Sequence, residues 1–247
     1  MRLIFCHAAH IRRMTEYEPL LERWSKAAGC LSVRVAAAWE CYGGDAPDCA
    51  FYAVDDTALL MVHGAGALLC GEVSDLQEIK TFLRMSGAAT LLCEAIAAQE
   101  SAKRRLSMRW NGKVEKCLQP AEFCAAPSLW RLSQSGLLDA DPQAYYADVC
   151  RRVNRGAALV YTCERDGAAY ATAGAYAVTE RAAYLSGVAT QETHRRQGCA
   201  SALVTALCAA LSPREVYLIC KPPLAAFYGR IGFEIDQELM EFEIGRG

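Results

Sequence analysis

The chain has 247 residues, of which 53% are hydrophobic and 22% are charged. These fractions are close to those of ordinary globular proteins and exclude disorder for most of the chain. Lysine and arginine total 26 against 28 aspartate and glutamate, so the formal net charge of -2 provides no general basic field for nucleic acid or anionic lipid. Any polyanionic ligand must therefore be held by a local group of residues.

The N-terminus and the cysteines indicate a cytoplasmic protein. Met1–His7 lacks the long apolar region of a secretory signal, and no apolar run approaches the roughly 20 residues that span a bilayer. The 13 cysteines are odd in number, and no pair has the C-x-x-C spacing of a zinc site. We therefore expect no membrane partner, no metal and no disulfide framework.

The first half of the chain has apolar patterns that predict a helix, three strands, a helix and a strand. In that order, the segments are Arg12–Ala28, Cys49–Val54, Ala58–His63, Ala67–Cys70, a helix that begins with a capping box at Ser74–Gln77 and runs through Met85, and Ala89–Cys93.

The middle of the chain holds a basic segment and a candidate linker. Lys103–Lys116 carries six basic residues, which favours a solvated helix face or loop over a nucleic-acid patch because the chain as a whole is acidic. Gln119–Gln134 contains Pro120 and Pro127 and is the best candidate for a linker.

The second half has the more distinct pattern. Pro142 follows Asp141 at a typical first helical position, and the helix ends at Asn154–Gly156. The segments expected next are three antiparallel strands, a helix, a strand, a short helix and a last strand: Ala157–Glu164, Ala168–Val178, Ala182–Thr190, a helix before Ser212, Glu215–Cys220, a helix from Pro222, and Glu238–Ile244.

A polar loop, Gln191–Ser201, joins the third of these strands to the helix. Unpaired backbone N–H groups at the positive end of a helix dipole bind phosphate. Gly198 and Ala200 would let a diphosphate approach the backbone, while Arg195 and Arg196 supply local positive charge. The alternative is a solvated loop with a glycine at an ordinary helix entry.

Two motifs in this half resemble the GNAT superfamily of N-acetyltransferases. In that family a V-A-T-like strand end leads to a loop [RQ]-x-x-G-x-[GA], and here Val188–Thr190 leads to Arg195–Ala200. The later family pattern F-Y-x-x-x-G-F matches Phe227–Phe233. The resemblance covers about Leu138–Ile244. It departs from the family at the start of the short helix, where Lys221 and Leu224 replace the frequent Asn-x-x-Ala and put one side-chain contact in doubt.

The resemblance implies direct transfer of an acetyl group from acetyl-CoA to an amine. It assigns coenzyme A binding to Val188, Ala189, Thr190, Arg195, Arg196, Gln197, Gly198, Cys199, Ala200 and Ser201. The backbone N–H of Val188 or Ala189 would hold the thioester oxygen, with Gly187 letting the strand bulge, and Tyr228 would protonate the departing thiolate.

A carboxylate or a dry cleft must also deprotonate the amine, since an ordinary lysine amine has a pKa of about 10.4. The nearest acids in sequence are Glu164, Glu180 and Glu192.

The implied fold class is α/β: a mixed, mostly antiparallel sheet flanked by helices, the acyl-CoA N-acyltransferase fold. Because both halves share the order meander, helix, strand, we expect tandem GNAT-like halves. Residues 1–130 would be a degenerate GNAT-like domain or an unrelated α/β domain, and residues 131–247 the acetyltransferase domain. The degenerate half has acid at Glu72 and Asp75, which repels a diphosphate.

The expected function is an acyl-CoA-dependent N-acetyltransferase acting on a small-molecule or protein amine. The alternative is a catalytically weak coenzyme A-binding module whose first half serves a partner interface. The acceptor, the acyl chain length and the formation of a homodimer stay open at this level.

Overall fold

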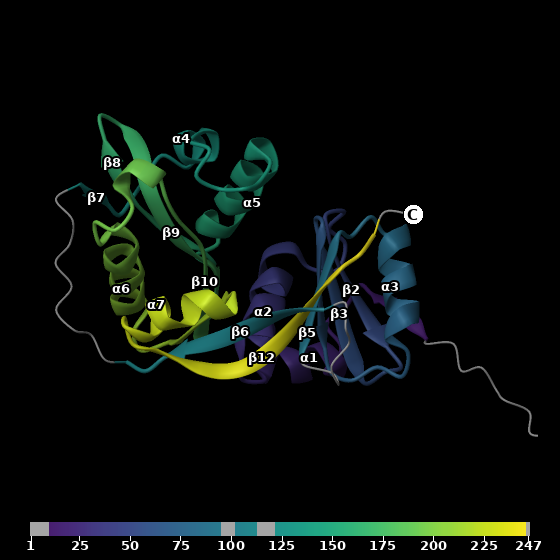
Figure 1. Ribbon diagram of the computed structural model, residues 1–247. Helices are drawn as coiled ribbons and strands as arrows, with labels where there is room; N and C mark the ends of the chain where they lie inside the picture. The colour runs from purple at the N-terminus through teal and green to yellow at the C-terminus, as the bar shows by residue number, and fades with distance from the viewer. Residues whose placement is uncertain (1–9, 95–101, 113–121, 246–247) are drawn as a thin grey trace, which may run out of the picture. The chain divides into compact units, whose positions relative to one another are not determined.

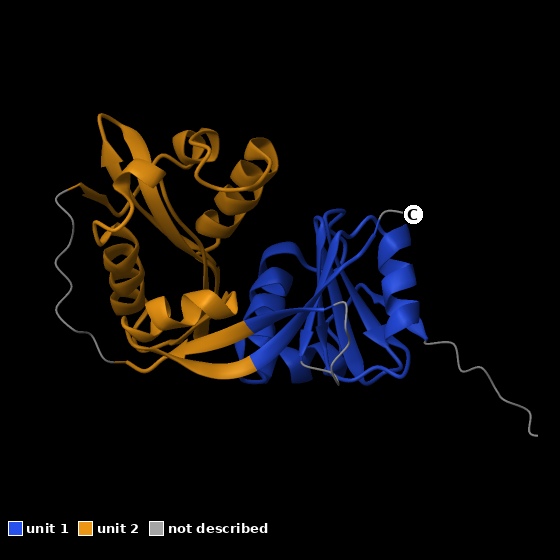
Figure 2. Cartoon of the chain, in the orientation of Figure 1, with its two compact units in different colours: residues 1–105, 238–247 blue, residues 106–237 orange. Residues whose placement is uncertain are grey.

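The computed structural model describes residues 10–94, 102–112 and 122–245. Two compact units can be distinguished (Figure 2), an N-terminal unit of residues 1–105 with 238–247 and a C-terminal unit of residues 106–237. In the described part, no helix is both long and apolar enough to cross a membrane.

The N-terminal unit is a mixed sheet with helices (Figure 1). Its elements are β1 Ile11–Met14, α1 Pro19–Lys26, α2 Cys30–Tyr42, β2 Cys49–Val54, β3 Ala58–His63, β4 Gly66–Cys70, α3 Leu76–Met85 and β5 Thr90–Glu94. The strands lie in the order β1-β2-β3-β4-β5. All neighbours are antiparallel except β4 and β5, which are parallel. The apolar face of α3, with Ile79 and Leu83, packs on Leu60, Leu69 and Leu91 of the sheet.

The C-terminal unit follows the same order of elements. It contains β7 Phe123–Cys124, α4 Leu129–Gln134, α5 Pro142–Asn154, β8 Leu159–Arg165, β9 Ala168–Val178, β10 Ala182–Thr190, α6 Cys199–Leu211, β11 Glu215–Cys220 and α7 Ala225–Gly229. The strand order is β7-β8-β9-β10-β11, and only β10 and β11 are parallel.

The two faces of this second sheet are covered by different helices (Figure 1). Leu203, Leu207 and Leu211 of α6 pack on one face, while α4 and α5 place Leu132 and Val149 against Val160 and Ala169 on the other. Asp141 caps α5 by accepting the Ala144 N–H at 2.8 Å, and Pro142 lies in its first turn, as predicted.

The sixth strand of each unit comes from elsewhere in the sequence. β12 (Phe233–Glu243) ends in the N-terminal unit, where its residues Leu239–Glu243 pair antiparallel with β5. β6 (Lys103–Trp110) enters the C-terminal unit, where its residues Leu106–Arg109 pair antiparallel with β11. The strand β6, which follows β5 in the chain, therefore pairs with β11, and the strand β12, which follows β11, pairs with β5.

The helix predicted at Arg12–Ala28 is wrong in its first part. Ile11–Met14 pairs residue by residue with Val54–Phe51 and is strand β1, while the helix begins only at Pro19. Helix α2 was not predicted, because a helix that is buried on nearly all sides has no polar face to mark its period.

The predictions for the middle segment also need correction. Lys103–Trp110 forms a strand rather than a helix or loop, and Lys113 and Lys116 lie outside the described residues. Ion pairs join Lys103 to Glu243, Arg104 to Glu238 and Arg105 to Glu241. These acids on β12 pair with three of the six basic residues.

The Gln119–Gln134 segment is structured from residue 122 on, as β7 and α4, and its residues 119–121 lie outside the described part. The capping-box reading of Ser74 is wrong in detail. Asp75 caps α3, whereas the Ser74 hydroxyl bonds to Asp55.

Candidate active site

A cavity of about 980 Å³ opens in the C-terminal unit where β10 ends and α6 begins. Its walls come from the end of β10, the loop to α6, the first turn of α6, the helix α7 and the segment after α4. The lining residues are Ser135, Gly136, Leu137, Val188, Ala189, Thr190, Gln191, Glu192, His194, Arg195, Arg196, Gly198, Cys199, Ala200, Ser201, Leu224, Phe227, Tyr228, Arg230 and Ile231.

The start of α6 leaves its backbone donors free of a side-chain cap. Gly198 is the N-cap residue with φ +85°, and no side chain caps the helix. A Cβ at Gly198 would meet nothing within 4 Å. Arg196 also has a positive φ, +62°, so residues with positive and negative φ alternate along the loop. Such alternation forms a concave nest of N–H groups, and the helix dipole adds to its positive potential.

Charged and polar side chains of the loop lie around this nest. The Arg195 Nε donates to the Thr190 carbonyl at 3.2 Å, and its Nη1 lies 3.3 Å from Glu192 Oε1. Gln197 is not among the residues that line the cavity, since its Nε2 donates to the Thr193 carbonyl at 3.2 Å. Of the ten residues predicted to bind coenzyme A, the other nine line one cavity.

The end of β10 separates from β11 and carries a bulge in its pairing with β9. Its parallel pairing with β11 ends at Leu185, opposite Leu218. Its pairing with β9 is interrupted between Ser186 and Ala189, where β10 carries one extra residue. Gly187, with φ +61°, lies in this bulge. Beyond it, the hydroxyl oxygen of Thr190 is buried and has no hydrogen-bond partner among the described residues.

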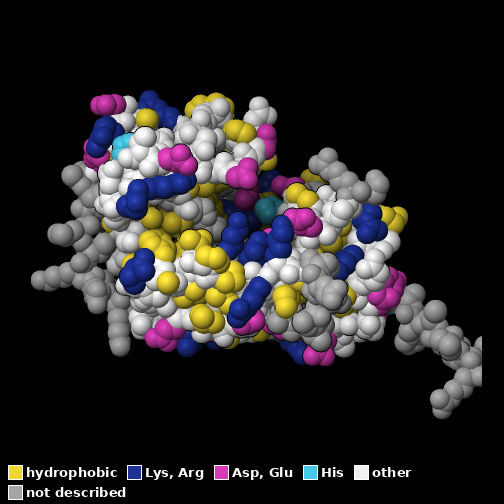
Figure 3. All heavy atoms as spheres, in the orientation of Figure 1, with side chains coloured by type: hydrophobic (Ala, Val, Ile, Leu, Met, Phe, Trp, Pro, Cys, Tyr) yellow, Lys and Arg dark blue, Asp and Glu magenta, His cyan; other side chains and the backbone are white. Residues whose placement is uncertain are grey.

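Tyr228 lies in the wall formed by α7. Its side chain is 8% exposed and packs edge-on against Phe227 and Phe233. Burial raises the pKa of its phenol to about 12. The phenol is therefore neutral at every working pH. In Figure 3 hydrophobic side chains gather over the place that α7 occupies in Figure 1, and Leu224 beside it is 47% exposed.

The three acids named from the sequence have different places. Glu192 lines the cavity and pairs with Arg195 at its rim, where the glutamate side chain is 86% exposed. Glu164 accepts a hydrogen bond from Thr162 at 2.8 Å and lies outside the cavity lining, as does Glu180 in the turn between β9 and β10.

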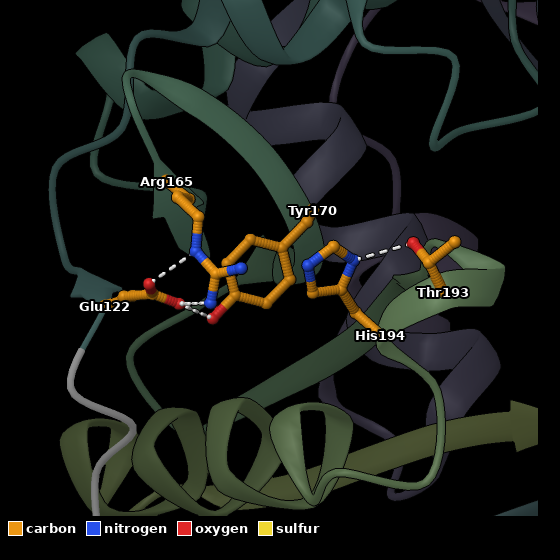
Figure 4. A network of polar contacts seen from close by, with 5 residues as sticks. All are labelled: Glu122, Arg165, Tyr170, Thr193 and His194. Carbon is orange, nitrogen blue, oxygen red and sulfur yellow. Dashed lines mark hydrogen bonds and ion pairs between the residues drawn. The ribbon is translucent and has the colours of Figure 1, made fainter.

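A polar network that the sequence did not indicate adjoins the cavity (Figure 4). The His194 ring lines the cavity, stacks on Tyr170 at 4.3 Å and bonds through Nδ1 to the Thr193 hydroxyl at 2.9 Å. The Tyr170 phenol donates to Glu122, which also accepts two hydrogen bonds from Arg165. The Arg165 guanidinium and the Tyr170 phenol lower the pKa of Glu122, so this carboxylate stays charged and holds Tyr170 beneath His194.

The wall residues Ser135–Leu137 were also missed, because the sequence places them just after a segment interpreted as a linker. The signal that could have found them is the Ser135–Gly136 pair directly after the apolar Leu129–Leu132 stretch, a typical helix end. Within the described ranges, no group of three or more His, Cys, Asp or Glu side chains could hold a metal ion.

Comparison with known proteins gives one family and a fold. The model of the acetyltransferase (GNAT) family matches residues 126–233. No curated protein matches the chain. Among solved structures, a GCN5-related N-acetyltransferase from Sphaerobacter thermophilus has a TM-score of 0.60 at 15% identity, with 97% of both chains covered.

Two further structures give the same result. A tandem GNAT protein from the clavulanic acid biosynthesis pathway has a TM-score of 0.55 at 14% identity, covering 97% of this chain and 99% of that one. A GNAT-family acetyltransferase from Colwellia psychrerythraea has a TM-score of 0.53 at 13% identity, covering 95% and 99%. At these identities the likeness establishes the fold, while the match to the acetyltransferase (GNAT) family model covers residues 126–233.

Proposed function

We propose that the protein is an N-acetyltransferase that transfers the acetyl group of acetyl-CoA to a primary amine of a small molecule or a protein. The observation that carries this proposal is the uncapped start of α6, where Gly198 lines the cavity together with Arg195, Arg196 and Thr190. The Thr190 hydroxyl is buried there and has no hydrogen-bond partner among the described residues. The GNAT family and fold imply acyl-CoA-dependent acetyl transfer.

The residues present fit the diphosphate of coenzyme A. Backbone N–H groups from Gln197 to Ser201 would donate to its oxygens, because the turn at Arg196 and Gly198 directs them to one side and no side chain occupies that space. Cys199 contributes only its backbone, since its side chain is buried in the core beneath the loop. The Thr190 hydroxyl would gain the partner that it lacks.

Bound acetyl-CoA would supply the acetyl group as a thioester. The N–H of Val188 or Ala189 would then donate to the thioester oxygen as negative charge develops on it. The bulge at Gly187 and the end of pairing with β11 at Leu185 support this role, because both free the strand's backbone on the cavity side.

Tyr228 would donate a proton to the departing thiolate. A phenol with a pKa of about 12 and a thiol with an ordinary pKa of about 8.5 differ by about 5 kcal/mol in proton affinity, so full transfer is uphill unless the thiolate is also desolvated. Phe227 and Ile231, in the apolar wall beside Tyr228, would desolvate the thiolate and thereby raise the proton affinity of the thiolate.

The N-terminal unit would be the first half of a tandem arrangement. The same order of strand, two helices, meander, helix and parallel strand in both units supports two GNAT-like halves. On this proposal the second half begins before β7, and the halves have exchanged their sixth strands. The first half would not bind a diphosphate, because Asp75 already occupies the helix start.

The test is calorimetric titration with acetyl-CoA, followed by chromatographic measurement of free coenzyme A in the presence of a panel of amines. The panel contains a polyamine, an aminoglycoside, an aromatic amine and a lysine peptide. We expect one binding site per chain and acceptor-dependent release of coenzyme A. Absence of binding would contradict the proposal, and binding without release for any amine would contradict the enzymatic part of it.

A further inference from the structure

Two irregularities lie close together in the pairing of β9 with β10, two residue pairs apart. Tyr184 pairs with Ala177 and Leu185 with Ala175, so Tyr176 has no partner on β10. Ser186 pairs with Gly174 and Ala189 with Thr172, so Gly187 and Val188 share one opposing residue. Each strand thus carries one extra residue, and such bulges redirect side chains and backbone beside active sites.

The ring of Tyr176 fills the space left by two glycines. A Cβ at Gly174 would lie 2.5 Å from Tyr176 Cε2, and a Cβ at Gly187 would lie 2.9 Å from the same atom. Such separations do not occur between real atoms, so Tyr176 and a side chain at either position exclude each other. The bulge of β9 therefore places an aromatic ring directly against the bulge of β10.

Helix α5 holds Tyr176 in this position. The Tyr176 hydroxyl lies 2.8 Å from the Tyr145 hydroxyl, and the two rings meet edge-on. Arg152 donates from Nη1 to the Tyr176 carbonyl at 2.9 Å and from Nε to Asp148 at 2.9 Å. Arg152 is 6% exposed, so these bonds are largely shielded from water. The ring is fixed by side chains that are not part of the cavity wall.

We infer that Tyr176 is a positioning residue for acetyl transfer, whose ring fixes the β10 bulge and thereby the direction of the Val188 and Ala189 amides. The inference rests on the proposed function, since these amides are the donors to the thioester oxygen. Tyr176 is not among the residues that line the cavity. Its loss should therefore change the rate of transfer and leave acetyl-CoA binding, which depends on the start of α6, almost intact.

The experiment uses four single variants of the full chain, one of them a control, and the double variant that combines Tyr176→Ala with Gly174→Ala. Tyr176→Ala removes the ring, Tyr176→Phe removes only the hydroxyl, and Gly174→Ala pushes on the ring from β9 without altering β10. Gly245→Ala is the matched control, because its added methyl meets no atom within 4 Å. The measurements are kcat with acetyl-CoA and the best acceptor of the amine panel, the Kd of acetyl-CoA, and amide hydrogen exchange in the peptide Leu185–Thr190.

We expect Tyr176→Ala and Gly174→Ala to lower kcat by about 10- to 100-fold, the range seen when a donor is misplaced or lost. The Kd should stay within about threefold in both variants, and exchange in Leu185–Thr190 should accelerate. Tyr176→Phe should restore most of the turnover. Adding Gly174→Ala to Tyr176→Ala should cause no further loss, because the ring with which the methyl collides is gone.

Unchanged turnover and exchange in Tyr176→Ala would overturn the inference, as would full additivity of the two alanine substitutions. If Tyr176→Ala does not fold, Gly174→Ala and Tyr176→Phe decide the question by the same criteria. If the wild-type protein neither binds nor consumes acetyl-CoA, the proposed function fails, and the exchange measurements alone decide whether Tyr176 fixes the bulge.

Discussion

Both units contain a three-stranded meander, but they begin the next helix differently. In the N-terminal unit the Asp75 carboxylate caps α3 and accepts the N–H groups of Gln77 at 2.8 Å and Glu78 at 3.1 Å. In the C-terminal unit Gly198 precedes α6, and no side chain caps the helix. One helix start carries its own anion, whereas the other is open to an anion from solution.

One arrangement of strands and helices can thus serve two purposes. A carboxylate at a helix N-terminus stabilises the helix by about 1 kcal/mol. An uncapped start forgoes that stabilisation and leaves the same donors for a ligand. On the proposed function, the chemistry of the helix start, rather than the fold, determines which unit can bind a diphosphate.

The largest effect is expected from adding an anion to the open helix start. Gly198→Glu places bulk and negative charge on the nest, and we expect the Kd of acetyl-CoA to rise at least 100-fold by calorimetry. The matched control is Gly87→Glu, since Gly87 also has a positive φ, +77°, and open space around its Cα but lies at the end of α3. If the two variants bind acetyl-CoA with equal affinity, the expected difference between the starts of α3 and α6 is contradicted.

Loss of the Tyr228 hydroxyl should have the next largest effect. Tyr228→Phe keeps the ring that packs on Phe233, so acetyl-CoA affinity should stay within about threefold while kcat falls by about 100-fold, as for the loss of a general acid. Tyr17→Phe, which removes an exposed hydroxyl in the N-terminal unit, serves as control. Turnover equal to wild type across the pH range would give Tyr228 a packing role only.

The capped helix start should respond in stability alone. Asp75→Ala leaves the first donors of α3 without a partner, and we expect about 1 kcal/mol less free energy of unfolding by urea denaturation. Acetyl-CoA affinity and kcat should not change, because the cavity belongs to the C-terminal unit. A change in affinity comparable to that of Gly198→Glu would mean that the N-terminal unit takes part in binding.

The smallest effect concerns alkaline pH. The folded-state pKa of Tyr228 is raised to about 12 from an ordinary value of 10. Its contribution to stability is therefore complete below pH 10 and is lost as the pH rises from about 10 to 12. We expect the melting temperature of Tyr228→Phe to fall less over this interval than that of the wild type. If the melting temperatures of the two proteins fall equally over this interval, the Tyr228 phenol is exposed to water.

Local patterns in the sequence predicted most of the fold. The apolar runs of β8, β9 and β10, the Asp141–Pro142 start of α5 and the apolar face of α6 depend on neighbours in the chain, and the structure has these strands and helices. The strand β1 and the exchanged strands β6 and β12 depend on partners far away in the sequence. A single sequence contains no signal for such pairings.

The parts of the candidate site that consist of backbone were predicted from the sequence. The loop with Gly198 and the strand end at Thr190 are marked by glycine and charge, and they line one cavity. His194 and Ser135–Leu137 were not predicted, because only the folded chain brings Ser135–Leu137 to the cavity and stacks Tyr170 on His194. Tyr176 was not predicted, because the role of its ring depends on the space that Gly174 and Gly187 leave by having no side chain.

The central claim is that the free amides at the start of α6 hold the diphosphate of coenzyme A. A crystal structure of the protein grown with coenzyme A tests it most directly. The account predicts the diphosphate within hydrogen-bond distance of the backbone N–H groups around Gly198, with Arg195 and Arg196 beside it and the pantetheine arm along Val188 and Ala189. A ligand bound at the start of α3, or a diphosphate away from Gly198, would contradict it.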